Sequence, residues 1–190
     1  MSSYKKEIGT AVQNFAGDPA NPLTGQLWYD SDASEFKYQE QVTGNAWSTG
    51  NSMNTARNQL ASAGTQTAAL GFGGGTPTVT ALTESYNGTN WTEVNDLNTA
   101  RKSAGGAGTQ TAALAYGGIS PSSLTVTEFW NGTSWTEVAD LNTARRSMGS
   151  GGTSTSAICA GGGPVATVDT ETWNGTSWTE VANLNTARNE

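Results

Sequence analysis

The sequence predicts an all-β protein built from one sheet-forming unit that recurs along the chain. Three observations predict this fold class. A sequence motif recurs at a nearly constant interval, and it contains a hairpin signal. The residues before it have small, apolar and uncharged side chains. The motif is NGTSWTEVADLNTAR at 131–145, with close copies at 87–101 and 174–188 and a more divergent copy, TGNAWSTGNSMNTAR, at 43–57.

Marker residues share the interval. Four tryptophans are spaced by 44, 44 and 43 residues, each with a Glu seven positions before it and an Arg ten positions after it. An interval of this size is typical of an array of supersecondary units. The markers are Trp47, Trp91, Trp135 and Trp178, with Glu40, Glu84, Glu128 and Glu171, and with Arg57, Arg101, Arg145 and Arg188.

Each part of the repeat predicts one strand of a four-stranded antiparallel sheet. Asn131-Gly132 lies between alternating runs at 125–130 and 134–138. This pattern predicts a hairpin with a type I′ turn, whose two central residues need positive φ. The small apolar run 111–118 predicts an inner strand covered on both faces. Residues 103–109 have so little side-chain bulk that we expect them nearest a central axis.

A double glycine falls sixteen residues after each of the first three marker arginines, as in Gly117-Gly118. With the aromatic in the next strand, the Trp that opens the last strand and the Arg that opens the following unit, residues 43–188 resemble the kelch repeat of β-propellers. The resemblance implies three regular four-stranded blades at 58–190 and an atypical first blade at 25–57. Propellers need at least four blades, so closure is expected either within the chain, with 7–15 as a further inner strand, or by oligomerisation.

The N-terminal stretch carries a second resemblance. Residues 1–24 end in GDPANPLTG and are expected to form an arm or linker and a possible docking segment. The following GQLWYD, a turn, and an F-x-Y strand resemble a module of bacteriophage tail-fibre and other virion proteins. Together with the repeats, the chain is similar to structural proteins of marine and freshwater phages, including cyanophages. This resemblance implies a virion component, a fibre, neck or head appendage, whose partners are its own copies and other virion proteins.

Composition excludes several other classes. The net charge is −7 and the basic residues are dispersed, whereas nucleic-acid binding needs a basic stripe. No segment approaches the ~20 apolar residues of a membrane span, and the N-terminus lacks the apolar run of a signal peptide. We therefore expect synthesis in the host cytoplasm without membrane insertion. The single cysteine, Cys159, aligns with Gly71 and Ala115, which predicts a small core residue.

Catalysis is not expected. The chain has no histidine, which removes the usual general base and the commonest metal ligand. The marker glutamates occur once per repeat, whereas a catalytic carboxylate pair is needed at one site only. We therefore expect no enzyme activity, no metal and no cofactor. The marker Glu and Arg residues are instead expected to form ion pairs that bridge blades beside a Trp, because Arg binds carboxylates bidentately and stacks on aromatic rings.

Ligand binding is left open by the sequence. The loops at 75–80, 119–124 and 163–167 differ most among the copies, which is expected both of a recognition surface and of neutral drift. The alternative function is therefore a carbohydrate-binding adhesin that recognises a host-surface glycan. Its candidate ligand residues are Thr76, Tyr116, Ser120 and Pro164.

Overall fold

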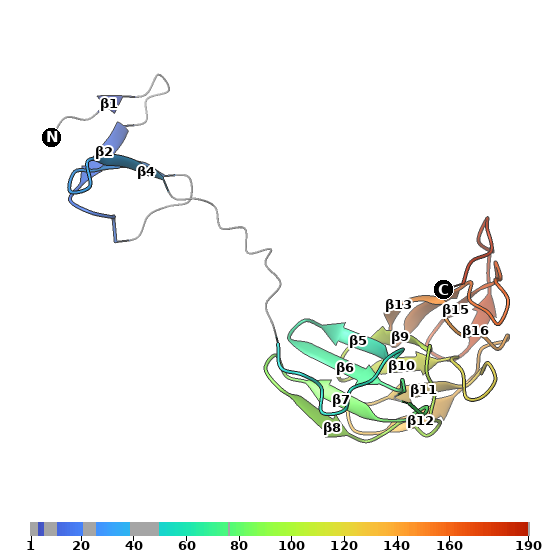
Figure 1. The fold of residues 1–190 in the computed structure, drawn as a ribbon. Coiled ribbons are helices and arrows are strands. Elements are labelled where there is room, and N and C mark those ends of the chain that lie inside the picture. The colour runs from blue at the N-terminus through green and yellow to red at the C-terminus, as the bar shows by residue number, and fades with distance from the viewer. Residues whose placement is uncertain (1–3, 6–10, 21–25, 39–49, 76, 190) are drawn as a thin grey trace. The chain divides into compact units, whose positions relative to one another are not determined.

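Strands make up all the regular structure in the residues that the computed structural model describes, which are 4–5, 11–20, 26–38, 50–75 and 77–189. The predicted all-β class is therefore confirmed. The chain divides into two compact units, Met1–Thr49 and Gly50–Glu190, and each is described by itself (Figure 1). Within the described ranges, no helix has the length and apolarity needed to cross a membrane.

The N-terminal unit contains β1 (Tyr4–Lys5), β2 (Ala11–Phe15), β3 (Leu27–Asp30) and β4 (Glu35–Tyr38), hydrogen-bonded in that order. Strands β3 and β4 form an antiparallel hairpin, but β2 pairs with β3 in parallel. The sheet is thus mixed, and the prediction of an antiparallel first blade is wrong for it. Residues 16–26 connect these two parallel strands, and their number is close to the roughly one dozen residues that such a crossover requires.

The boundary of the atypical first blade also differs from the prediction. Residues 50–57 belong to the second unit, where Arg57 forms an ion pair with Glu84. The described strands of 25–57 belong to the N-terminal unit. The markers Glu40 and Trp47 lie outside the described residues.

The second unit consists of three four-stranded sheets, which we call the first, second and third repeat sheets (Figure 1). Each is an antiparallel meander whose strands pair in chain order, as the repeat predicts. The strands are β5 (Ala61–Thr65), β6 (Ala68–Phe72), β7 (Thr83–Tyr86) and β8 (Trp91–Val94); β9 (Gly105–Gly108), β10 (Ala113–Tyr116), β11 (Thr127–Trp130) and β12 (Trp135–Val138); and β13 (Gly149–Thr153), β14 (Ser156–Ala160), β15 (Thr170–Trp173) and β16 (Trp178–Glu180).

The Asn-Gly turn joins the outer two strands by a different geometry from the predicted one. Trp130 pairs with Trp135, which leaves a four-residue loop, and Gly132 has φ 94° whereas Asn131 does not have positive φ. The Asn131 Oδ1 accepts hydrogen bonds from the amides of Thr133 and Ser134, both at 2.9 Å. The type I′ turn is therefore wrong, and the asparagine is needed for its side-chain acceptor.

Two hydrophobic cores lie between consecutive sheets. Alternate residues of β10 point to opposite sides, so Ala113 and Ala115 face the first repeat sheet while Leu114 and Tyr116 face the third. All four side chains are fully buried, which confirms the predicted inner strand. The first core holds Leu70, Phe72, Ala113, Ala115, Trp130 and Trp135, and the second holds Leu114, Tyr116, Ala157, Cys159, Trp173 and Trp178.

The innermost strands lie close together, with β9 between β5 and β13 (Figure 1). A Cβ on Gly106 would lie 2.4 Å from the carbonyl oxygen of Ser62, so this approach requires glycine. The Ser103 amide donates to the Gln59 carbonyl at 2.8 Å, and the Ser147 amide donates to the Ser103 carbonyl at 3.0 Å. The small residues at 103–109 thus lie where the three sheets come together, as expected.

Candidate functional site

The marker Arg and Glu residues meet in buried clusters. In the second repeat sheet, Arg101 Nη2 donates to Glu128 Oε1, and Arg101 Nη1 donates to the carbonyl of Val126 at 2.6 Å. The amides of Asn98 and Thr99 donate to the two Glu128 oxygens at 2.7 and 3.1 Å. Both oxygens of the carboxylate are therefore engaged, and Arg101 and Glu128 are fully buried.

The same cluster is built once in each repeat sheet. Arg57 and Glu84 are 2.9 Å apart, and Arg145 and Glu171 are 2.7 Å apart. None of the six side chains is more than 2% exposed. We call them the three Arg–Glu clusters: Arg57–Glu84, Arg101–Glu128 and Arg145–Glu171.

Each connecting segment binds two sheets at once. In the segment 95–101, the amides of Leu97 and Arg101 donate to the carbonyls of Ala81 and Thr80 in the first repeat sheet, at 3.1 and 3.3 Å. The Arg101 side chain meanwhile binds Glu128 in the second repeat sheet. The Arg101–Glu128 and Arg145–Glu171 clusters thus join consecutive sheets, as the sequence interpretation proposed, whereas Arg57–Glu84 lies in the first repeat sheet, which has no preceding repeat sheet among the described residues.

The marker Trp adds a second contact between the same two sheets. We call the whole interface between two consecutive repeat sheets a joint. The indole Nε1 of Trp135 donates to Thr83 Oγ1 in the first repeat sheet at 3.1 Å, and its ring lies 4.9 Å from that of Phe72. The Trp135 carbonyl accepts from Asn98 Nδ2 at 3.1 Å. An asparagine, rather than the arginine, therefore hydrogen-bonds the Trp within the joint.

The electrostatics of the clusters favour a structural role. Burial lowers the pKa of Arg101, and the nearby Glu128 carboxylate opposes that shift by favouring the charged guanidinium. Because the pair is neutral overall and the carboxylate already accepts several hydrogen bonds, a substrate would have to break the cluster to reach it. The clusters can orient sheets, but they offer no accessible acid or base.

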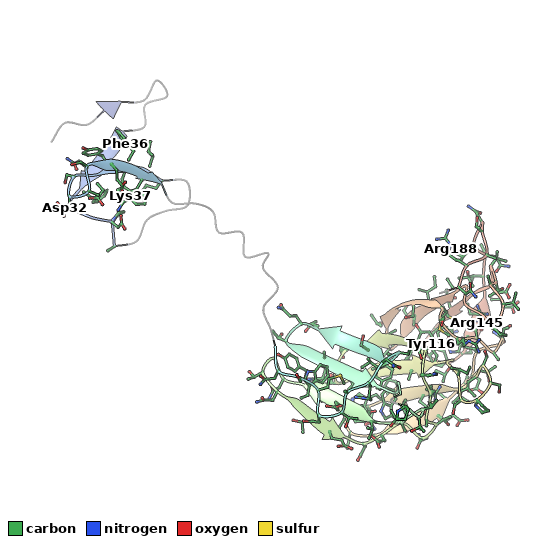
Figure 2. All side chains as sticks on the ribbon, in the orientation of Figure 1. Asp32, Phe36, Lys37, Tyr116, Arg145 and Arg188 are labelled. Atoms are coloured by element: carbon green, nitrogen blue, oxygen red, sulfur yellow. The ribbon has the colours of Figure 1, made fainter. Side chains whose placement is uncertain are left out.

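The fourth marker arginine is different. The main chain of Arg188 docks on the third repeat sheet, donating to Thr167 and accepting from Gly162 at 3.2 and 2.9 Å, as Arg101 docks on the first. Its side chain is exposed and, among the described residues, has no carboxylate partner. Figure 2 shows Arg188 at the edge of the unit and Arg145 within its body.

Of the candidate ligand residues, Tyr116 is in the core. It is fully buried on β10, its ring lies 4.7 Å from that of Trp178, and its hydroxyl donates to the Ile158 carbonyl at 3.0 Å. Burial raises its pKa. The prediction that Tyr116 lies on a ligand-contacting loop is therefore wrong, because the turn begins only after it, at Gly117.

Of the remaining candidates, Ser120 and Pro164 lie in corresponding loops of the second and third repeat sheets. Pro164 is exposed and Ser120 is half-buried. Ser123 Oγ donates to the Gly163 carbonyl at 3.5 Å, so the loops of the second and third repeat sheets adjoin. Thr76 lies outside the described residues.

The core position predicted for Cys159 is confirmed. Its side chain is fully buried in the second core, and burial raises its thiol pKa to about 12. The thiol therefore stays protonated near neutral pH and is no nucleophile.

A shallow hollow of about 360 Å³ lies at the ends of the innermost strands. All its lining side chains are uncharged and small, so it has backbone groups but no titratable group to offer a ligand. The lining includes Ser62, Gly64, Thr65, Gly106, Gly108 and Gly152.

A charged cluster in the N-terminal unit was missed by sequence reasoning. The nearly buried Asp30 carboxylate accepts from Lys37 Nζ at 2.7 Å and from the amides of Gly17, Asp32 and Ala33 at 3.0–3.2 Å. The Lys37 ammonium, with these amides, lowers the pKa of Asp30 to about 2, and the carboxylates of Asp30 and Asp18 raise the pKa of Lys37. The available signal was an Asp at the end of a strand-like run, immediately before turn residues.

No protein-family model matches this chain, and no curated protein matches it. Within the part of the chain that the structure describes, His, Cys, Asp and Glu residues form no group of three or more that could hold a metal ion.

Removing one arginine from a cluster should destabilise the repeat unit strongly. In Arg145→Met, the Glu171 carboxylate stays buried without its cation, and breaking a buried pair in this way costs about 3–5 kcal/mol. The exposed Arg188 is the matched control, because Arg188→Met should change stability by less than about 0.5 kcal/mol. Urea unfolding followed by tryptophan fluorescence measures both. Equal effects of the two variants would show that the cluster does not stabilise the fold.

The N-terminal unit should lose stability in acid through Asp30. Its folded pKa of about 2 lies below the unfolded value of ~3.9. The contribution is therefore complete above pH ~4 and is lost as the pH falls towards 2. NMR signals of the Asp32 and Ala33 amides, which donate to Asp30, should follow this transition. Asp30→Asn should abolish it, whereas the exposed Asp32→Asn should retain it; a transition unchanged in Asp30→Asn contradicts the assignment.

Proposed function

We propose that the chain is a non-enzymatic structural component of a phage virion, a fibre, neck or head appendage, whose kelch-like β-propeller blades form a rigid scaffold for assembly or host-surface adhesion. The observation that carries the proposal is the threefold recurrence of one buried Arg–Glu cluster, two copies of which lie at the two joints between the repeat sheets. A group that recurs in every unit serves what every unit needs, which is attachment to its neighbour.

The arrangement of the sheets supports the blade interpretation. Each repeat sheet is a four-stranded meander, consecutive sheets share an aromatic core, and the innermost strands lie side by side. Propeller blades have these properties. The double glycine of the kelch-like repeat has a physical role in this arrangement. Gly117 and Gly118 both take positive φ, and the carbonyl of Arg145 lies directly beside Gly117.

The N-terminal unit supplies a surface for attachment to other virion proteins. Phe36 is 60% exposed and Leu27 is 43% exposed, and the Phe36 ring lies 5.1 Å from that of Tyr29. In the β3–β4 hairpin, the pairing of Tyr29 with Phe36 places these side chains on one face. An exposed apolar face of this kind is typical of an interaction site.

The virion assignment is tested by locating the chain. Antibodies against residues 50–190 should label purified particles of the phage that encodes it, and the chain should be found in those particles by mass spectrometry at a fixed ratio to the other virion proteins. A major capsid protein and a non-virion protein of the same phage are the matched controls. Recovery only from the infected-cell lysate, with particles free of the chain, would contradict the proposal.

The second candidate function, a glycan-binding adhesin, is favoured by the adjoining loops at 119–124 and 163–167. If these loops bind a host-surface glycan, a glycan array should give a sharp signal that is weakened by Ser120→Ala and by Pro164→Ala. The exposed Thr136→Ala, on the outermost strand of the second repeat sheet, should not alter it. Signals that all three variants leave unchanged would remove these loops as the site.

A further inference from the structure

We propose that the third repeat sheet of one chain docks on the first repeat sheet of a second copy, and that two copies thereby close a ring of six sheets. The inference rests on the propeller part of the proposed function and not on the phage origin. Propellers have about four to eight blades, and the described residues of each chain supply three repeat sheets. Six is the only multiple of three in that range.

Equivalent residues show that the third repeat sheet has an uncovered face. Leu70 on β6 and Leu114 on β10 are both fully buried against the following sheet. Ile158, the corresponding residue on β14, is 44% exposed. The face that carries Ile158 therefore corresponds to one that is covered in both preceding sheets, and it carries the same kind of side chain.

The first repeat sheet has the complementary uncovered face. Trp135 and Trp178 are buried, and each indole Nε1 donates to a threonine of the preceding sheet, Thr83 or Thr127, at 3.1 and 3.0 Å. The equivalent Trp91 is only half-buried. In the proposed joint, Trp91 donates to Thr170 of the second copy, the threonine that corresponds to Thr83 and Thr127.

Further donors and acceptors match in the same register. The Ser103 amide donates to the Gln59 carbonyl, and the Ser147 amide donates to the Ser103 carbonyl. By the same pattern, the Gln59 amide of one chain would donate to the Ser147 carbonyl of the other. Gln110 Nε2 donates to the carbonyls of Ala69 and Tyr86. Gln66, its exposed equivalent, would donate to Ala157 and Trp173 of the second copy. The donors lie at one end of the unit and the acceptors at the other.

The aromatic position of the internal joints has no aromatic equivalent in the proposed one. Phe72 and Tyr116 stack on the marker Trp of the following sheet, but the corresponding residue of the third repeat sheet is Ala160. Trp91 would therefore have no aromatic partner across the joint. We expect the joint between copies to be weaker than the joints within a chain, so that it forms and dissociates reversibly.

Docking of two copies requires one connecting segment to be displaced. Segment 95–101 contacts both of its sheets, so each joint has room for one such segment. Between copies two are present, 51–57 of one chain and 182–188 of the other. Arg57 is buried in its cluster whereas Arg188 is exposed and unpaired among the described residues. Segment 182–188 is thus the one displaced, and the amides of Met53 and Arg57 replace those of Leu184 and Arg188 on the carbonyls of Val168 and Thr167.

The mass in solution tests the proposal on the full chain. Light scattering should give twice the chain mass of 19.6 kDa at high concentration, falling towards the single-chain mass on dilution. Ile158→Lys on one end and Ala69→Lys on the other should each give single chains. Thr136→Lys, an exposed position on the middle sheet, should leave the dimer intact. Circular dichroism checks that all three variants are folded. Single chains for the unaltered protein at every concentration, or any other multiple, would overturn the proposal.

Mixing the two end variants separates head-to-tail docking from a symmetric contact. An equimolar mixture of Ile158→Lys and Ala69→Lys should recover dimers, because one joint then forms between two unaltered faces. A symmetric contact between identical faces would not be rescued, and failure of rescue overturns the proposal.

Leu184→Asp, which loosens the displaced segment 182–188, should tighten the dimer; a weaker dimer overturns the displacement step. None of these results depends on whether the chain is found in phage particles, so the two proposals fail separately.

Discussion

The buried ion pair between an arginine of a connecting segment and a glutamate of the next sheet is the interaction on which the repeat unit depends. Burying a charge costs several kcal/mol unless its partner and its hydrogen bonds are well placed. Glu128 meets that condition only when Arg101, Asn98 and Thr99 all point at it. Because the same segment is hydrogen-bonded to the preceding sheet, satisfying one carboxylate fixes the placement of two sheets.

Apolar burial and the ion pair have separate tasks in each joint. The aromatic core between sheets, such as Trp135 against Phe72, removes most area from water and supplies the stabilisation. Apolar contact is not directional, so it does not select one orientation. The cluster and the Trp135–Thr83 hydrogen bond are directional, and they select the orientation. Glycine at 106 then allows the innermost strands to approach.

The sequence predicted what local chemistry determines and missed what distant pairing determines. The antiparallel meanders were predicted from alternating apolar and polar residues and from turn residues. Both signals depend on residues only a few positions apart in the sequence. The type I′ turn was wrong because Asn-Gly also suits a four-residue loop in which Asn131 acts through its side chain. The parallel pairing of β2 with β3 is non-local and leaves no periodic signal. The Asp30–Lys37 pair was missed because only the hairpin brings those residues together, and Tyr116 was misplaced by a few residues at a strand end, where boundaries are least certain.

The two ends of the repeat unit differ, and this difference governs how copies can associate. One end carries the exposed Ile158 and the buried Thr170, and the other carries the half-buried indole donor of Trp91. Such faces complement each other but not themselves, so contact between them is head to tail. Head-to-tail contacts give rings when the rotation per unit closes and filaments when it does not. Here the rotation is set inside the chain by two joints of the same construction, built on the same cluster and the same Trp–Thr hydrogen bond. A third joint of that construction continues the same rotation, so the two internal joints determine whether copies close a ring or extend a filament.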